Sequence, residues 1–315
     1  MRENTPKGRD ENGKQQTAVA LGFFDGVHQG HRRVIEKAVS LANGHLIPAV
    51  FTFTMHEGGP SKKQGAGEIT TLEQKIRILK KMGIQQIYAP DFSDFRNLSG
   101  EAFVRQILQE KMNAAAVCCG EDFRFGKGAS CDAESLSRFC KTFGLSCTVL
   151  EEVMDGGEAV SSTRVRQAIA AGEMERARQL LGRRYFLDFP VEHGKALGRR
   201  LQFPTINQPI PPQMVLPRFG VYATMAQVDG KTYAGVTNIG VRPTVEKGMA
   251  PRAETYLIGF SGDLYGKEIP VTFLSFLRPE QKFDSVEALR AQIAADAQKA
   301  DQIVKKALQE DFPMV

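Results

Sequence analysis

The chain has 315 residues, 42% hydrophobic and 24% charged, a composition that excludes a collagen-like or wholly disordered protein. At about 100–200 residues per domain, this length predicts two domains. The 41 basic and 36 acidic residues give a net charge of +5, and because the excess forms no single block we expect no nucleic-acid partner.

Residues 1–16 are polar, carry mixed charge and lack the apolar core of a signal peptide. No apolar run in the chain approaches the length of about 18 residues that a membrane span needs. We therefore expect a disordered leader over 1–16, no membrane partner and a cytoplasmic location. Five cysteines without metal-ligand spacing are interpreted as reduced thiols: Cys118, Cys119, Cys131, Cys140 and Cys147.

Residues 17–182 alternate short apolar runs with helical patterns. Strands are predicted over 18–21, 46–53, 84–89, 114–119 and 147–149. Helices are predicted over 31–43, from a cap at Thr70 or Thr71 to Gly83, around 103–108, over 135–143 and over 162–181, the last with a break at 171–172. This alternation predicts an α/β domain with a doubly wound, Rossmann-like parallel sheet that binds ligands at the carboxyl ends of its strands.

Residues 183–315 have a different pattern, in which glycines and prolines separate short strand candidates. These candidates lie at 191, 220–223, 233–237, 254–260 and 269–277 and predict a small antiparallel β-barrel or sandwich. A long helix closes the chain, with a capping box between Asp284 and Glu287. Its apolar stripe comprises Leu289, Ile293, Ala297, Ala300 and Val304.

The most informative motif lies between the first predicted strand and the first predicted helix. It reads Gly22-Phe23-Phe24-Asp25-Gly26-Val27-His28-Gln29-Gly30-His31. Doubly wound folds bind phosphates at this place, where glycines let the backbone approach an anion. We expect His28 and His31 to stabilise charge on a reacting phosphorus. Gly22, Phe23, Asp25 and Gly30 are the phosphate-binding candidates of this turn, which does not have the P-loop pattern.

This motif resembles the His-x-Gly-His signature of the nucleotidyltransferases and, more narrowly, the prokaryotic bifunctional riboflavin kinase/FMN adenylyltransferases, or FAD synthetases. The segment 120–126, Gly-Glu-Asp-Phe-Arg-Phe-Gly, is similar to the family's flavin-side loop and implies flavin contacts for Asp122, Phe123 and Arg124. The segment 161–166, Ser-Ser-Thr-Arg-Val-Arg, is similar to its second nucleotide-binding motif. That similarity implies ATP contacts for Ser162, Thr163 and Arg166.

One loop departs from the family pattern. The family has Thr-Phe-x-Pro-His-Pro after the second strand, whereas residues 52–57 read Thr-Phe-Thr-Met-His-Glu. His56 is kept and both prolines are replaced. This departure favours a more mobile loop, which would weaken its contact with the flavin phosphate or ATP and so impair adenylyl transfer.

The second domain begins with a segment that resembles the riboflavin kinase signature. Residues 193–207 read His-Gly-Lys-Ala-Leu-Gly-Arg-Arg-Leu-Gln-Phe-Pro-Thr-Ile-Asn. Its Gly-Lys stretch supplies phosphate donors, and the candidates are Gly194, Lys195 and Gly198. Thr205 and Asn207, two apart on an extended segment, offer oxygens on one side to Mg²⁺.

Two further segments complete the second resemblance. Residues 238–244, Asn-Ile-Gly-Val-Arg-Pro-Thr, are similar to the family's substrate loop and imply a flavin contact for Arg242. Glu254 occupies the place of the family's general base, which accepts the hydroxyl proton during phosphoryl transfer. Asp263 is the rival base, although its Ser-Gly-Asp setting is typical of an Asx turn. The segment Arg278-Pro279-Glu280 is interpreted as structural.

The resemblance implies a two-step flavin enzyme with ATP as co-substrate and Mg²⁺ as cofactor. Residues 183–315 would phosphorylate riboflavin to FMN, and residues 17–182 would adenylylate FMN to FAD with release of pyrophosphate. Three alternatives stay open at this point. They are a riboflavin kinase with an impaired adenylyltransferase domain, a nucleotidyltransferase for another metabolite, and a non-catalytic flavin-binding sensor.

Overall fold

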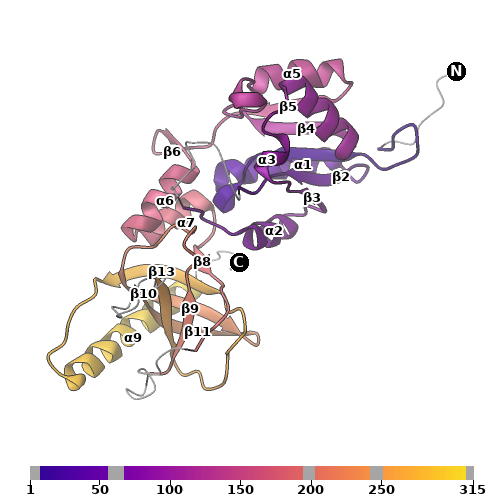
Figure 1. The fold of residues 1–315 in the computed structure, drawn as a ribbon. Coiled ribbons are helices and arrows are strands. Elements are labelled where there is room, and N and C mark those ends of the chain that lie inside the picture. Colours follow the sequence, from indigo (N-terminus) through magenta and orange to yellow (C-terminus); the bar gives the residue numbers. More distant parts are fainter. Residues whose placement is uncertain (1–7, 56–66, 194–202, 242–250, 310–315) are drawn as a thin grey trace. The chain divides into compact units, whose positions relative to one another are not determined.

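The computed structural model describes residues 8–55, 67–193, 203–241 and 251–309 (Figure 1). Its contacts divide the chain into two compact units. The first unit comprises residues 1–65 and 70–162, and the second comprises 66–69 and 163–315. Residues 163–182 therefore group with the second unit in the structure, whereas the sequence pattern places the boundary after residue 182.

The first unit contains a parallel sheet of five strands in the order β3-β2-β1-β4-β5. The strands are β1 (Thr17–Leu21), β2 (Ile47–Phe51), β3 (Gln86–Tyr88), β4 (Ala114–Gly120) and β5 (Ser146–Leu150). Strand β1 is central, with β2 on one side and β4 on the other. The predicted doubly wound sheet is confirmed, and its topological switch point lies where β1 ends.

Helices connect these parallel strands. They are η1 (Asp25–Val27), α1 (Gln29–Ala42), α2 (Leu72–Lys81), α3 (Phe92–Phe95), α4 (Gly100–Ala102), η3 (Phe103–Lys111), η4 (Lys127–Ala129) and α5 (Ala133–Thr142). A short hairpin of β6 (Met154–Asp155) and β7 (Glu158–Ala159) follows. Thr71 caps α2 in a capping box with Gln74, which confirms one of the two predicted caps. The predicted helix around 103–108 is a π-helix, η3.

Residues 8–16 differ from the leader expected there. They form a turn with a β-bridge between Arg9 and Gln15. The Asn113 side chain, on the residue before β4, donates to Asp10 Oδ2 at 3.0 Å and to the Gln15 carbonyl at 3.2 Å. These hydrogen bonds fix the polar segment to the amino-terminal end of the sheet, although the segment has no apolar pattern of its own. Residues 1–7 lie outside the described residues.

The second unit contains an antiparallel sheet of six strands in the order β8-β13-β10-β11-β12-β9. The strands are β8 (Phe186–Leu187), β9 (Thr205–Pro209), β10 (Gly220–Val228), β11 (Lys231–Gly240), β12 (Arg252–Leu257) and β13 (Val271–Arg278). One segment links both edges, because Leu187 pairs with β13 and Glu192 bridges to Asn207 of β9. The sheet thus curves round as the predicted antiparallel β domain.

Helix α9 (Val286–Gln309) closes this unit against β10, β11 and β13. Ala300 of its predicted stripe is buried in a cluster with Val221 and Val236, and Val304 is buried as well. Its cap is Ser285, whose Oγ accepts from Ala288 N at 3.1 Å, so the predicted cap at Asp284 is one residue early. A buried carboxylate interrupts the stripe, since Asp296 is 1% exposed.

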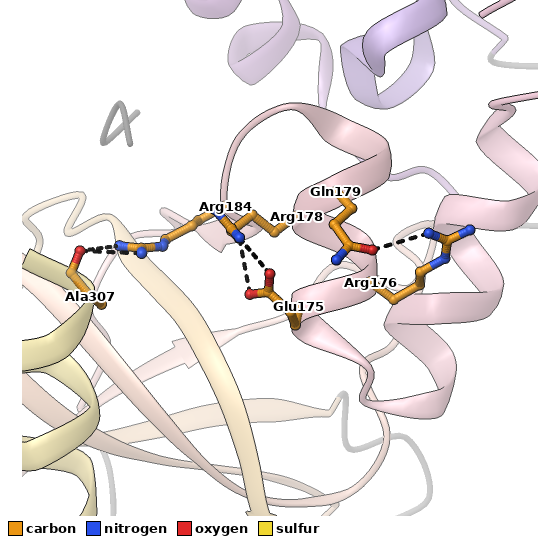
Figure 2. A network of polar contacts seen from close by, with 6 residues as sticks. All are labelled: Glu175, Arg176, Arg178, Gln179, Arg184 and Ala307. Atoms are coloured by element: carbon orange, nitrogen blue, oxygen red, sulfur yellow. Dashed lines mark hydrogen bonds and ion pairs between the residues drawn. The ribbon is translucent and has the colours of Figure 1, made fainter. Parts of the chain in front are cut away.

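Helices α6 (Ser162–Ala171) and α7 (Met174–Leu181) confirm the predicted break at 171–172. Figure 2 shows polar contacts within α7, between Glu175 and Arg178 and between Arg176 and Gln179, together with those of Arg184 after the helix. Buried Arg184 donates to the Ala307 carbonyl at 3.3 and 3.4 Å, so a cation lies at the carboxyl end of α9, where the helix dipole favours it. Among the described residues, no helix combines the length and the apolar character that crossing a bilayer requires.

Candidate active sites

The turn after β1 has a strained backbone. Phe24 and Val27 adopt φ angles of 53° and 42°, and Gly26 adopts 76°. Left-handed values are rare for Phe and Val, and such strain is concentrated at functional sites. The turn ends at His28, whose extended backbone starts helix α1.

The two histidines of the motif are stacked at the amino end of α1. The ring centroids of His28 and His31 are 3.6 Å apart, with 19° between the ring planes. His28 Nδ1 accepts from His31 N at 3.3 Å, so His28 is also the helix cap. A Cβ at Gly30 would lie 3.2 Å from His28 Cε1, which explains why a glycine suits that position. The structure thus brings both predicted catalytic histidines together at the start of helix α1, the end of a helix that favours anions.

Hydrogen bonds to Thr70 and Ser162 hold the turn in place. Asp25 is buried, and its Oδ1 accepts from Thr70 N at 3.2 Å. Gly26 N donates to Thr70 Oγ1 at 3.1 Å, and Ser162 Oγ donates to the Asp25 carbonyl at 3.0 Å. The Asp25 carboxylate, a predicted phosphate-site residue, therefore contacts the chain itself, and Ser162 joins the second nucleotide motif to the first.

A buried lysine also contacts this turn. Lys75 Nζ donates to the Phe23 carbonyl at 2.8 Å, and Thr52 Oγ1 donates to the same oxygen at 2.8 Å. The sequence interpretation missed Lys75. The signal was its spacing, because Lys75, Ile78, Leu79 and Met82 follow the i, i+3, i+4, i+7 pattern of one buried helix face.

The other residues of the second nucleotide motif lie on α6. Thr163 is exposed in the first turn of this helix. Arg166 Nε donates to the Gly67 carbonyl at 2.7 Å. An exposed hydroxyl and the helix N–H groups beside it are suited to an anionic ligand.

The predicted flavin-side loop follows β4 and is joined to the histidine turn by aromatic contacts. Phe123 and Phe125 stack with centroids 5.7 Å apart, and Phe125 lies 5.5 Å from Phe103. Ring contacts of 4.8 to 5.5 Å continue through Phe103, Phe51, Phe95, Phe53 and Phe23. Asp122 and Arg124 are exposed on this loop, and Arg124 pairs with Asp132 at 3.8 Å. The loop therefore both packs into the core and presents polar groups outward.

The second site lies across three neighbouring strands. In register, Glu254 of β12 pairs with Asn207 of β9 on one side and with Asn238 of β11 on the other. Directly paired residues share a face of an antiparallel sheet, and Thr205 lies on that same face of β9. The structure thus brings the predicted base together with both predicted metal ligands.

The opposite face of these strands is the interior of the unit. Ala253, Thr255 and Leu257 alternate with Glu254 and are buried. The hydroxyls of Thr224, Thr237 and Thr255 form a ladder with two contacts of 2.8 Å. This fully buried ladder fixes the register and so fixes which residues flank Glu254.

The rival base has the turn role that its sequence setting indicates. Asp263 Oδ1 accepts from Tyr265 N at 3.0 Å, which is an Asx turn. The Tyr265 ring in turn stacks on His193, with centroids 3.7 Å apart. Four predicted site residues, Gly194, Lys195, Gly198 and Arg242, lie outside the described residues, as do His56 and Glu57 of the altered loop.

The thiols of the first unit have unequal acidities. Burial raises the pKa of Cys118, and it raises the pKa of Cys119 to about 12. Cys147 is the opposite case, because a hydrogen bond from the Cys140 thiol and another from Ser137 Oγ lower its pKa to about 7. The Cys140 thiol that donates has a raised pKa.

Comparison with known proteins assigns each half of the chain to a family. Residues 10–164 match the family model for FAD synthetase, and residues 181–304 match the model for riboflavin kinase. The relative from Listeria monocytogenes, a bifunctional riboflavin kinase/FMN adenylyltransferase, is 35% identical over 285 residues, which cover 89% of this chain and 90% of the relative. The protein of the same name from Escherichia coli K12 is 34% identical over 284 residues, 88% of this chain and 90% of that protein.

A solved structure supports the fold. The crystal structure titled "Macrolide-efflux Protein from Streptococcus pneumoniae" superposes with a TM-score of 0.79 and 29% identity. The match covers 94% of this chain and 97% of that one. This likeness concerns the backbone architecture.

Proposed function

Because the chain belongs to the bifunctional riboflavin kinase/FMN adenylyltransferase family, we propose how its own residues divide the two reactions. The chain is an enzyme that phosphorylates riboflavin to FMN and adenylylates FMN to FAD, with ATP as co-substrate. The observation that carries the assignment of the second step is the stacked pair of His28 and His31, at the switch point of a parallel sheet. We place adenylyl transfer in residues 17–182 and phosphorylation in 183–315.

In the adenylyl transfer, an FMN phosphate oxygen attacks the α-phosphorus of ATP. The new oxygen–phosphorus bond forms as the bond between the α-phosphorus and its bridging oxygen breaks, and pyrophosphate leaves. His28 and His31 donate to the phosphate oxygens and stabilise the charge that develops on them. The N–H groups at the start of α1 add to this stabilisation, and no covalent enzyme intermediate is needed.

Residues around the turn hold the nucleotide. Gly22 and Gly30 let backbone and phosphates approach, with Phe23 beside them, and Ser162, Thr163 and Arg166 of the second motif bind the triphosphate. Asp25 stabilises the turn and does not contact the nucleotide in this proposal, because its carboxylate accepts a hydrogen bond from Thr70 N. This is a supporting role, which fits its buried position.

The flavin of FMN is proposed to bind near Asp122, Phe123 and Arg124. Phe123 and Phe23 are half-buried at the two ends of the aromatic run, and their rings are the apolar groups that we propose for contact with the isoalloxazine ring. Thr54, at the start of the altered loop, is held by two backbone hydrogen bonds although the family's prolines are absent. Thr54 N donates to the Pro90 carbonyl at 3.0 Å, and the Thr54 carbonyl accepts from Phe92 N at 2.9 Å. We therefore propose that adenylyl transfer is retained.

In the phosphorylation, the riboflavin 5′-hydroxyl attacks the γ-phosphorus of ATP, and ADP leaves as the β,γ-bridging bond breaks. Glu254 accepts the hydroxyl proton. Thr205 and Asn207 supply neutral oxygen donors beside this carboxylate, a set that suits Mg²⁺. Mg²⁺, when bound, would neutralise charge on the phosphates. Gly194, Lys195 and Gly198 are proposed for the phosphates and Arg242 for the flavin.

A time course tests the function directly. Purified chain is incubated with riboflavin, ATP and Mg²⁺, and riboflavin, FMN and FAD are separated by chromatography. FMN that rises and then gives way to FAD supports both activities, whereas accumulation of FMN alone would leave a riboflavin kinase with an impaired first unit.

We retain a cytoplasmic location, where ATP is available, as part of the proposal.

A further inference from the structure

Lys75 is a buried cation close to the proposed adenylyl-transfer site. Its residue exposure is 4%, and lysines are almost never fully buried unless they are paired. It lies in the first turns of α2, on the face that packs inward with Ile78 and Leu79. An alanine or leucine would satisfy that packing, so the charge at this position needs a separate reason.

Described contacts of Lys75 join it to Phe23, a residue of the histidine turn, directly and through Thr52. Nζ donates to the Phe23 carbonyl at 2.8 Å and lies 4.3 Å from the centroid of the Phe23 ring. It also donates to Thr52 Oγ1 at 3.3 Å, and Thr52 donates to the same Phe23 carbonyl at 2.8 Å. One carbonyl oxygen therefore receives a charge-assisted and a neutral hydrogen bond.

The orientation of the Phe23 carbonyl is coupled to the backbone conformation of the residues that follow it in the turn. The Phe23 carbonyl belongs to the peptide plane that leads into Phe24, the first left-handed residue of the turn. Phe24 is 1% exposed, and its ring meets His31 edge-on, with centroids 5.2 Å apart. A change in the Phe23–Phe24 peptide plane is thus transmitted to the stacked histidine pair.

We propose that Lys75 is a positioning residue for adenylyl transfer, which holds the Phe23 carbonyl and thereby the strained turn that places His28 and His31. The inference rests on the proposed function of the first unit. Lys75 acts through the turn, so its loss is expected to lower kcat more than it raises KM.

The test uses the full-length chain with Lys75→Met, and Lys80→Met as matched control. Lys80 is an exposed lysine of the same helix, so its replacement removes the same charge from α2. FMN adenylylation is measured for kcat and for both KM values, and riboflavin phosphorylation by the same chain is the internal standard. We expect kcat for adenylylation to fall at least ten-fold in Lys75→Met, with KM values within three-fold of wild type and phosphorylation unchanged.

A spectroscopic measurement separates positioning from mere stabilisation. The ring signals of His28 and His31 in a ¹³C-labelled histidine spectrum depend on their mutual stacking. Lys75→Met should shift these two signals in the fully folded chain, and Lys80→Met should leave them in place. If Lys75→Met does not fold, Thr52→Val removes the neutral donor from the same carbonyl and should lower kcat about three-fold, with the same two signals shifted.

Four results would overturn the inference. They are an unchanged kcat in folded Lys75→Met, a rise in the KM for ATP alone, unshifted histidine signals, and equal loss of both activities with a lower melting temperature. If the wild-type chain does not adenylylate FMN, the proposed function fails instead, and that is seen before any variant is compared.

Discussion

Glu254 of β12 and Asn207 of β9 are directly paired across the antiparallel sheet of the second unit. The pair places the Glu254 carboxylate and the buried Asn207 amide on one face of the sheet, while Thr255, the next residue, joins the buried threonine ladder on the other face. The interior ladder therefore sets the register that aligns the proposed base with the proposed metal ligands.

Glu254→Gln should abolish riboflavin phosphorylation selectively. Glutamine keeps the shape of the side chain but accepts no proton, and loss of a general base costs about 10²–10⁴-fold in rate. Adenylylation of supplied FMN should stay within two-fold of wild type. Both rates are measured by chromatography of the flavins.

The matched control is Asp263→Asn, which removes the rival carboxylate and keeps an oxygen for the Tyr265 N–H. It should phosphorylate riboflavin normally. A large loss in Asp263→Asn with little loss in Glu254→Gln would reverse the assignment of the base.

Gly30→Ala should impair adenylyl transfer without destabilising helix α1. Alanine normally stabilises a helix interior relative to glycine by about 0.5–1 kcal/mol. At this position the new Cβ would lie 3.2 Å from His28 Cε1, and the stacking of His28 on His31 at 3.6 Å limits how far the ring can retreat. We expect a loss of roughly ten-fold or more in kcat, consistent with misplaced donors. A folded Gly30→Ala chain with full activity would show that the ring geometry does not matter.

Asp296→Ala should destabilise the second unit. Asp296 accepts from Arg278 at 2.8 and 2.9 Å and from Gln292 at 3.0 Å, and it is 1% exposed. Removal of one partner of a buried ion pair costs about 3–5 kcal/mol in the free energy of unfolding. The free energy of unfolding of the wild-type and variant chains is measured by urea denaturation.

Asp301→Ala is the control on the same helix, because Asp301 pairs with Lys305 at an exposed position. Surface pairs contribute about 0–1 kcal/mol. Equal effects of the two substitutions would mean that the Arg278–Asp296 pair does not anchor α9 to β13.

Cys147 should be alkylated more readily at neutral pH than Cys118, Cys119 or Cys140, whose pKa values are raised. Its lowered pKa of about 7 means that the reactive thiolate forms as the pH rises through 7, well below the pKa of about 12 at Cys119. Peptide mapping after iodoacetamide treatment at a series of pH values gives the midpoint. In Cys140→Ala the donor to the thiolate is lost, and the midpoint should move up toward the ordinary thiol value of about 8.5. A midpoint near 8.5 in the unchanged chain would contradict the described hydrogen bond.

Local patterns were enough to predict most elements of the fold. The apolar runs and caps predicted the parallel sheet, and Thr71, Gly83 and the break at Gly172 lie where the chain turns. Long-range polar contacts could not be predicted in the same way. Asn113 fixes residues 8–16 across about a hundred residues of sequence, and the buried Asp296 pairs with Arg278 of β13.

The candidate sites show the same division. Residue type and spacing in the motif predicted His28 and His31, whereas Glu254 was predicted from the resemblance to the riboflavin kinase family. The pairing of Glu254 with Asn238, the inward carboxylate of Asp25 and the contact of Lys75 with the Phe23 carbonyl depend on register and packing, which spacing does not encode. Asp25 and Lys75 act through their neighbours, so no single-residue signature marks them.

The division of the two reactions is tested most directly by a complementation experiment with two single variants. His31→Ala should convert riboflavin to FMN and stop, and Glu254→Gln should convert FMN to FAD but leave riboflavin untouched. Mixed in one reaction with riboflavin, ATP and Mg²⁺, the two chains should together produce FAD, detected by chromatography. If either variant alone produces FAD from riboflavin at the wild-type rate, or if the mixture produces none while each retains its single activity, the assignment of the reactions to these residues is contradicted.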